Sequence, residues 1–183
     1  RAEALERELG FVRNWAVCGP FGYTTRSVHA QEFGPERELD LSREERSLWK
    51  KLSWQVLEAP GAGRRVNLFA PLAPREGCAY ALAQVHWSPG GQGPSVRRTS
   101  GAPHRPARAD PDCMPAVLVF RCEGSHKLWW NDELVLDADL GRERRPCESA
   151  LAVRLRKGWN RLLVKVTAAN PVVSCGLVDT SGY

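Results

Sequence analysis

The chain has 183 residues, of which 43% are hydrophobic and 26% charged, the balance of an ordinary globular protein. A domain of this length can bury a core without disulfides or metals, and no apolar run approaches the ~18 residues that a membrane helix needs. The formal net charge of +5 comes largely from arginine, and we interpret it as a solvated surface rather than a nucleic-acid site.

Residue 1 is arginine rather than methionine, so we expect a processed chain or a piece of a longer protein. Residues 1–10 predict a short N-terminal helix or a linker, because Leu5 and Leu9 are four positions apart and Gly10 stands where a helix C-terminal cap belongs. Residues 11–183 are then expected to form a single folded domain.

After the first ten residues, the sequence predicts many short strands separated by turn residues. Residues 78–87 are apolar on both faces, which favours a central strand. Ser42 and Glu45 have the spacing of a capping box, which predicts a short helical turn through Leu48 and Trp49. The expected strands are residues 14–18, 54–58, 78–87, 115–122, 127–130, 134–136, 151–155, 162–167 and 172–178. Residues 38–41 are expected to form a short strand or an extended segment, and residues 66–72 another extended segment.

Residues 88–115 differ in composition from the rest of the chain. They hold six of its 13 prolines and four of its glycines, with no aromatic residue and no apolar periodicity. A segment with so little to bury predicts a long, flexible and irregular insertion.

The C-terminal part of the chain carries the clearest strand pattern. Apolar residues recur at every second position in 151–155 and in 162–166, on either side of turn residues at 157–160. We expect these two strands to pair with each other in an antiparallel sheet with one buried face. Upstream, Asn131 and Asp132 separate two strand patterns and both tolerate positive φ, which predicts a two-residue hairpin turn. The fold class expected from these strands is all-β, a β-sandwich.

The six cysteines are widely spaced and include no Cys-x-x-Cys pair, so zinc ribbons and thioredoxin-type motifs are not supported. Cys113 and Cys147 fall near expected loops and are the better candidates for a disulfide, but the connectivity stays open. A zinc site that combines Cys122 and His126 with the loop cysteines matches no standard spacing and is not favoured.

Three parts of the sequence, in this order, resemble a known family: residues 10–21 followed by 33–41, residues 127–135, and residues 153–166. Together they resemble the galactose-binding-like, jelly-roll modules of large bacterial secreted or envelope proteins. The resemblance implies a jelly-roll sandwich and an extracytoplasmic location, either periplasmic, cell-surface or secreted. The sequence departs from the family pattern at Asp132, where the hairpin glycine is usual, and at residues 123–126, where such modules often carry an acidic turn.

Two features are candidate ligand sites. Trp129 and Trp130 face opposite sides of their strand, and the family resemblance places Trp130 inward, which leaves Trp129 as a platform for stacking a sugar ring. Packing under a loop is the alternative for Trp129. Asp137 and Asp139, with Glu143 nearby, predict an oxygen-rich loop that could bind ligand or calcium, and a solvated turn is the alternative.

The expected function is that of a non-catalytic accessory module of a larger bacterial protein, binding carbohydrate through Trp129, Asp137 and Asp139. The expected partners are a glycan or neighbouring domains of the same chain, with no cofactor other than calcium considered. The alternative is a structural or protein–protein interaction domain that positions its neighbours. A Cys- or His-dependent enzyme is the least favoured reading, and the glycan hypothesis itself rests on analogy of fold.

Overall fold

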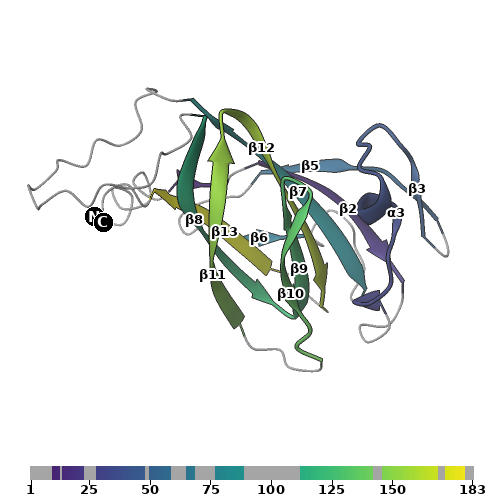
Figure 1. The fold of residues 1–183 in the computed structure, drawn as a ribbon. Coiled ribbons are helices and arrows are strands. Elements are labelled where there is room, and N and C mark those ends of the chain that lie inside the picture. Colours follow the sequence, from purple (N-terminus) through teal and green to yellow (C-terminus); the bar gives the residue numbers. More distant parts are fainter. Residues whose placement is uncertain are drawn as a thin grey trace, which may run out of the picture.

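A computed structural model describes residues 10–12, 14–22, 28–47, 50–58, 65–68, 77–88, 112–141, 146–168 and 172–179 (Figure 1). The predicted N-terminal helix, apart from Gly10, and residues 89–111 of the predicted insertion lie outside this range. Strand β8 begins at Cys113, so the last three residues that we assigned to the insertion belong to the fold.

The described chain is nearly all β-structure, which confirms the expected fold class. The helix α3 (Gly34–Arg37) is a single turn, and none of the described helical structure is long and apolar enough to span a membrane. The strands are β1 (Gly10–Phe11), β2 (Asn14–Phe21), β3 (Glu45–Arg46), β4 (Lys51–Leu52), β5 (Gln55–Glu58), β6 (Val66–Asn67), β7 (Cys78–Trp87), β8 (Cys113–Glu123), β9 (Ser125–Trp130), β10 (Glu133–Ala138), β11 (Pro146–Arg156), β12 (Gly158–Thr167) and β13 (Val172–Asp179).

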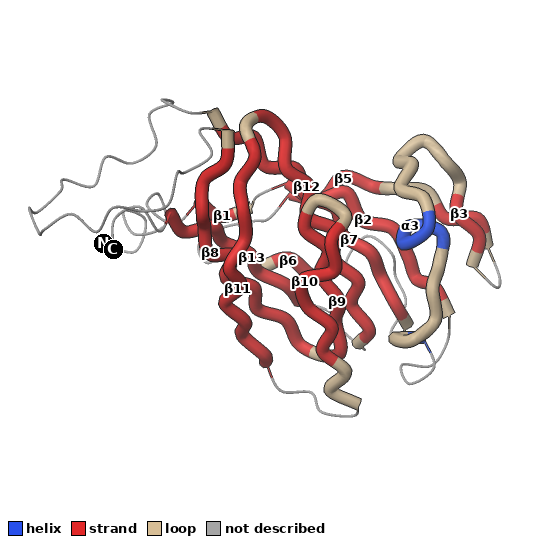
Figure 2. The backbone as a smooth tube through the Cα atoms, in the orientation of Figure 1, coloured by secondary structure: helices blue, strands red, loops and turns tan. Residues whose placement is uncertain are grey.

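The strands form two main antiparallel sheets (Figure 2). Sheet A has the order β1–β13–β8–β11, and β6 also pairs with β13. Sheet B has the order β10–β9–β12–β7–β2–β5, so β7 is central, as its two apolar faces predicted. Strands β3 and β4 form a separate two-stranded sheet.

The main core lies between sheets A and B. Leu118 and Phe120 of β8 belong to one buried cluster with Leu162 and Val164 of β12, and all four side chains are fully buried. Burial of side chains of this size contributes about 1.5–3 kcal/mol each. The two sheets therefore form a sandwich held by the inward side chains of both.

Strands β11 and β12 do not pair with each other, and our expectation on this point was wrong. β11 pairs with β8 in sheet A, whereas β12 pairs with β7 and β9 in sheet B. The chain crosses between the sheets at Gly158, whose φ of +91° is in the region that favours glycine. Buried Asn160 holds this corner, because its Oδ1 accepts the Arg156 N–H at 2.8 Å and its Nδ2 donates to the Arg156 carbonyl at 2.7 Å.

The hairpin between β9 and β10 confirms the predicted turn. Asn131 and Asp132 have φ values of +49° and +72°, as the two central residues of a type I′ turn require. The Asn131 side chain also connects the turn to β12, because its Nδ2 donates to Asn160 Oδ1 at 3.0 Å and its Oδ1 accepts the Arg161 N–H at 2.9 Å.

Residues 28–47 and 50–52, which we call the cover segment, pack on the face of sheet B that points away from sheet A (Figure 1). Val28 and Leu52 of this segment share a second buried cluster with Tyr80 of β7 and Leu163 of β12. Leu163 and Lys165 are therefore buried, although the alternation along β12 predicted only one buried face.

The predicted helical turn after Ser42 is wrong, and residues 38–41, which were expected as a short strand or an extended segment, form no strand. Glu45 lies in β3 instead, while Leu48 and Trp49 lie outside the described residues. The Ser42 N–H and hydroxyl both donate to Asp40 Oδ1, at 2.8 and 2.7 Å. Ser42 therefore takes part in a local turn of the kind that aspartate favours, rather than capping a helix.

Candidate functional site

A groove of about 330 Å³ opens on the outer face of sheet B, beside the cover segment. This volume falls at the lower end of the ~300–1,000 Å³ of small-molecule sites. One wall comes from α3 and the residues after it, and the rest comes from β9, its turn and β12. The lining residues are Pro35, Glu36, Arg37, Leu39, Trp129, Asp132, Arg161 and Leu163.

Trp129 and Leu163 supply apolar surface on the strand side of the groove. They are cross-strand neighbours in the β9–β12 pair, and Trp129 is half-buried against the second cluster. Trp130 faces the main core, and its Nε1 donates to the Arg154 carbonyl at 2.9 Å. The two tryptophans thus face opposite sides of β9 as expected, and ligand stacking on Trp129 stays a prediction.

Polar groups flank this apolar surface. The Arg161 guanidinium, on β12, donates to the carboxylate of Asp132 in the β9–β10 turn. Arg37, on the α3 side, donates to the Glu32 carbonyl at 3.4 Å. The groove therefore combines an indole and a leucine with charged hydrogen-bonding groups at its edges.

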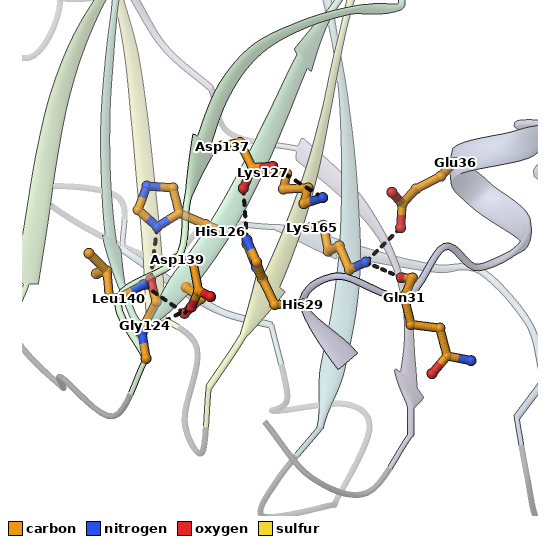
Figure 3. A network of polar contacts seen from close by, with 12 residues as sticks. His29, Gln31, Glu36, Gly124, His126, Lys127, Asp137, Asp139, Leu140 and Lys165 are labelled. Carbon is orange, nitrogen blue, oxygen red and sulfur yellow. Dashed lines mark hydrogen bonds and ion pairs between the residues drawn. The ribbon is translucent and has the colours of Figure 1, made fainter. Parts of the chain in front are cut away.

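The α3 wall is fixed to sheet B by a buried ion pair (Figure 3). Lys165 Nζ lies 2.7 Å from Glu36 Oε1 and donates to the Gln31 carbonyl at 2.5 Å. The Tyr80 hydroxyl donates to the same Glu36 oxygen. Burial, followed by the neighbouring Cys78 and Glu36, raises the pKa of Tyr80, so its hydroxyl keeps its proton at neutral pH.

The thiols beneath this wall are protonated at neutral pH. Burial raises the pKa of Cys78 to about 12. Burial, with the charge of Glu45, also raises the pKa of Cys18 to about 12. Because the thiolate is the reactive form of cysteine, both thiols should react slowly at neutral pH.

Asp137 and Asp139 do not line the groove. Asp137 Oδ1 lies 2.8 Å from His29 Nε2, and its Oδ2 lies 3.2 Å from Lys127 Nζ (Figure 3). Burial opposes ionisation of Asp137, but these hydrogen bonds and positive charges outweigh burial and lower its pKa.

Asp139 also makes its contacts within the chain. Its Oδ1 accepts the Gly141 N–H at 3.0 Å and the Ser125 hydroxyl at 3.1 Å, and these bonds lower the pKa of Asp139. Of the three predicted ligand residues, the structure therefore brings only Trp129 to the groove. A ligand role for the two aspartates stays a prediction.

The metal hypotheses find no cluster to support them within the described residues. No three side chains of His, Cys, Asp or Glu come together there in a way that could hold a metal ion. His126 is buried, and its Nδ1 donates to the Gly124 carbonyl at 2.8 Å. Glu143 lies outside the described residues, so calcium at this end of the sandwich stays a prediction.

Sequence reasoning missed Trp159, which it counted only among the turn residues 157–160 and which lies on β12 with 68% of its surface exposed. It shares the outer face of β12 with Arg161 and Leu163. Its ring packs edge-on against the His86 ring, with the two ring centroids 4.9 Å apart. Four positions separate Trp159 from Leu163, a distance of about 13 Å along a strand. The outward position of Trp159 could have been predicted from the sequence. Adjacent residues of a strand face opposite sides, so Trp159 points outward if its neighbour Asn160 points inward.

No protein-family model and no curated protein matches the chain. Among solved structures, it is similar to selenomethionine-labelled β-glucosidase from Kluyveromyces marxianus, with 13% identity and a TM-score of 0.46 over 90% of this chain. The glucose complex of β-glucosidase from the same organism matches 69% of this chain with 15% identity and a TM-score of 0.40. The chain spans 14% of the length of each of these two structures, and so distant a likeness carries no conclusion about activity or ligand.

Proposed function

We propose that the chain is a non-catalytic accessory module of a larger bacterial protein and that it binds carbohydrate in the groove beside Trp129. The observation that carries the proposal is the composition of this groove. Trp129 and Leu163 offer apolar surface, and the Arg161–Asp132 pair stands at the edge. A sugar ring has an apolar C–H face and polar hydroxyls at its rim, which an indole and charged hydrogen-bonding groups complement.

The carboxylates that line the groove already have partners within the chain, which supports binding of a carbohydrate without hydrolysis. Glycoside hydrolysis uses a pair of carboxyl groups, one as proton donor and the other as base or nucleophile. Glu36 is bound by Lys165 and Tyr80, and Asp132 is bound by Arg161. The Glu36 side chain, only 7% exposed, therefore acts as the buried anion of a structural ion pair, and Asp132 is the partner of a surface arginine.

The resemblance to galactose-binding-like modules supports the same function and, with it, a periplasmic, cell-surface or secreted location. Asp132, where this sequence departs from the family pattern, has a role in the proposed binding. Asp132, which replaces the usual hairpin glycine, brings a carboxylate to the edge of the groove. Hydroxyl groups of a bound sugar would donate to this carboxylate and accept from Arg161.

A glycan array followed by calorimetry on the positive glycans tests the proposal. The wild-type protein should bind at least one glycan, and Trp129→Ala should weaken that binding at least tenfold, which corresponds to about 1.4 kcal/mol. Trp159→Ala is the matched control, because it removes an indole from the same face outside the groove, and it should keep wild-type affinity. Thermal unfolding checks that both variants fold. Absence of binding to every glycan, or equal affinity of Trp129→Ala and wild type, rejects the proposal.

A second candidate is docking onto a neighbouring domain of the same parent chain. Val56 favours it, because this residue of the edge strand β5 is 85% exposed. Exposed apolar residues on an edge strand are suited to cover by another domain. Binding of the flanking domain to wild type but not to Val56→Asp, together with a negative glycan array, would replace the first candidate with this one.

A further inference from the structure

Strands β8 and β11 of sheet A place two cysteines opposite each other. Their register pairs Cys122 with Cys147. Directly opposite residues of antiparallel strands have Cα atoms about 4.5–5.5 Å apart and side chains on the same face. Disulfides bridge Cα separations of about 4.4–6.8 Å. The backbone therefore already holds these two thiols at a separation that a disulfide can span.

All six cysteines lie in described strands, and no other two of them stand opposite each other on paired strands. Cys113 stands opposite Arg156, and Cys175 stands opposite Phe120. Sequence reasoning favoured Cys113 and Cys147 because both were expected near loops, and they are indeed the first residue of β8 and the second residue of β11. Only the pairing of β8 with β11 selects Cys122 as the partner of Cys147.

The two thiols differ in accessibility. Cys122 is fully buried in the main core, whereas Cys147 is half-buried. Burial raises the pKa of Cys122, and the neighbouring Cys147 raises it further, as expected for two thiols that stand opposite each other on paired strands. An oxidant therefore meets Cys147 first, and Cys122 is placed to react with the product.

We propose that Cys122 and Cys147 form an intrachain disulfide by exchange with a disulfide compound, written R–S–S–R. The Cys147 thiolate attacks one sulfur of this compound, which forms the mixed disulfide Cys147–S–S–R and releases one R–S⁻. The Cys122 thiolate then attacks the Cys147 sulfur, which breaks the mixed disulfide and releases the second R–S⁻. The two cysteine protons end on two R–SH molecules, and the two electrons lost by the cysteines reduce R–S–S–R.

The bond would join β11, at the edge of sheet A, covalently to β8. It would also close a loop that contains the whole β9–β10 hairpin. Closing a loop of this length restricts the unfolded chain, so oxidation should raise the melting temperature by roughly 5–10 °C.

The test starts from the reduced full chain, which is incubated with oxidised glutathione, denatured and alkylated. Mass spectrometry should find four of the six cysteines alkylated and a peptide that links Cys122 to Cys147. The melting temperature should rise on oxidation and return to its starting value after reduction. A dithiol peptide in the same solution verifies that the oxidant is active.

Two single variants make the test specific. Cys147→Ser should remove both the linked peptide and the oxidant-dependent rise in melting temperature. Cys113→Ser removes another half-buried cysteine of the same strand pair and should retain both. Six alkylated cysteines after oxidation of the wild type, or a link between any other two cysteines, overturns the proposal.

Discussion

Asp137 illustrates how a single residue of this protein connects separate elements. It lies on β10, and its carboxylate meets Lys127 of the neighbouring β9 and His29 of the cover segment (Figure 3). The sequence pointed to Asp137 as part of an open, oxygen-rich loop. The structure gives its oxygens partners within the chain, which accounts for the lowered pKa.

Replacing Asp137 by asparagine should make the protein less sensitive to acid. Because the pKa of Asp137 is lower in the folded than in the unfolded chain, its carboxylate contributes stability that is fully present above the unfolded value of about 3.9. This contribution is lost as the pH falls through the lower folded value. Urea unfolding at a series of pH values should therefore show a steeper loss of stability between about pH 5 and pH 2 for wild type than for Asp137→Asn. Equal slopes would contradict this account.

At the scale of elements, the α3 turn depends on sheet B for its position. A four-residue helix is too short to be stable alone. The Glu36 side chain anchors it to Lys165 of β12, and these side chains are 7% and 0% exposed. Since Glu36 and its neighbours line the groove, this buried pair also sets the position of one groove wall.

Replacing Lys165 by methionine should destabilise the protein by about 3–5 kcal/mol, because it leaves the Glu36 carboxylate buried without its cation. The double variant Lys165→Met/Glu36→Gln should recover much of this loss, because it removes the unpaired charge. Lys127→Met is the matched control on the next strand, where the partner Asp137 is 44% exposed and the cost should be smaller. Denaturant unfolding measures all three. A double variant as unstable as the single one would count against the ion pair as the cause.

At the scale of the whole molecule, the corner between β11 and β12 is where the chain passes from sheet A to sheet B. Asn160 forms hydrogen bonds there with Arg156 on the preceding strand and with Asn131 in the hairpin turn. One buried amide therefore fixes the corner and the hairpin together. Trp159 is next to this corner on β12, and Trp129 is close to the hairpin turn on β9.

Replacing Asn160 by alanine should cost about 1–3 kcal/mol, because it removes the hydrogen bonds that this buried side chain forms with Arg156 and Asn131. Asn14→Ala is a suitable control, since Asn14 is exposed on β2 and should change stability by at most about 0.5 kcal/mol. Equal melting temperatures of the two variants would show that the corner does not depend on the Asn160 side chain.

Much of the fold follows from local sequence. The alternation in 151–155, the two positive-φ residues at 131 and 132, and the opposite faces of Trp129 and Trp130 were all predicted. Each of these features depends on residues one to four positions apart, which the backbone geometry of a strand or turn relates directly. The same alternation would have turned Trp159 outward had it been applied there.

Only the tertiary structure decided which surfaces meet. The strand pattern defines an apolar face but names no partner for it, so it could not show that β11 and β12 lie in different sheets. Nor could it show that the cover segment buries Lys165, that α3 supplies a groove wall beside Trp129, or that β8 carries Cys122 to Cys147. These contacts join residues far apart in the chain, and they are selected by burial summed over the whole molecule rather than by any local preference.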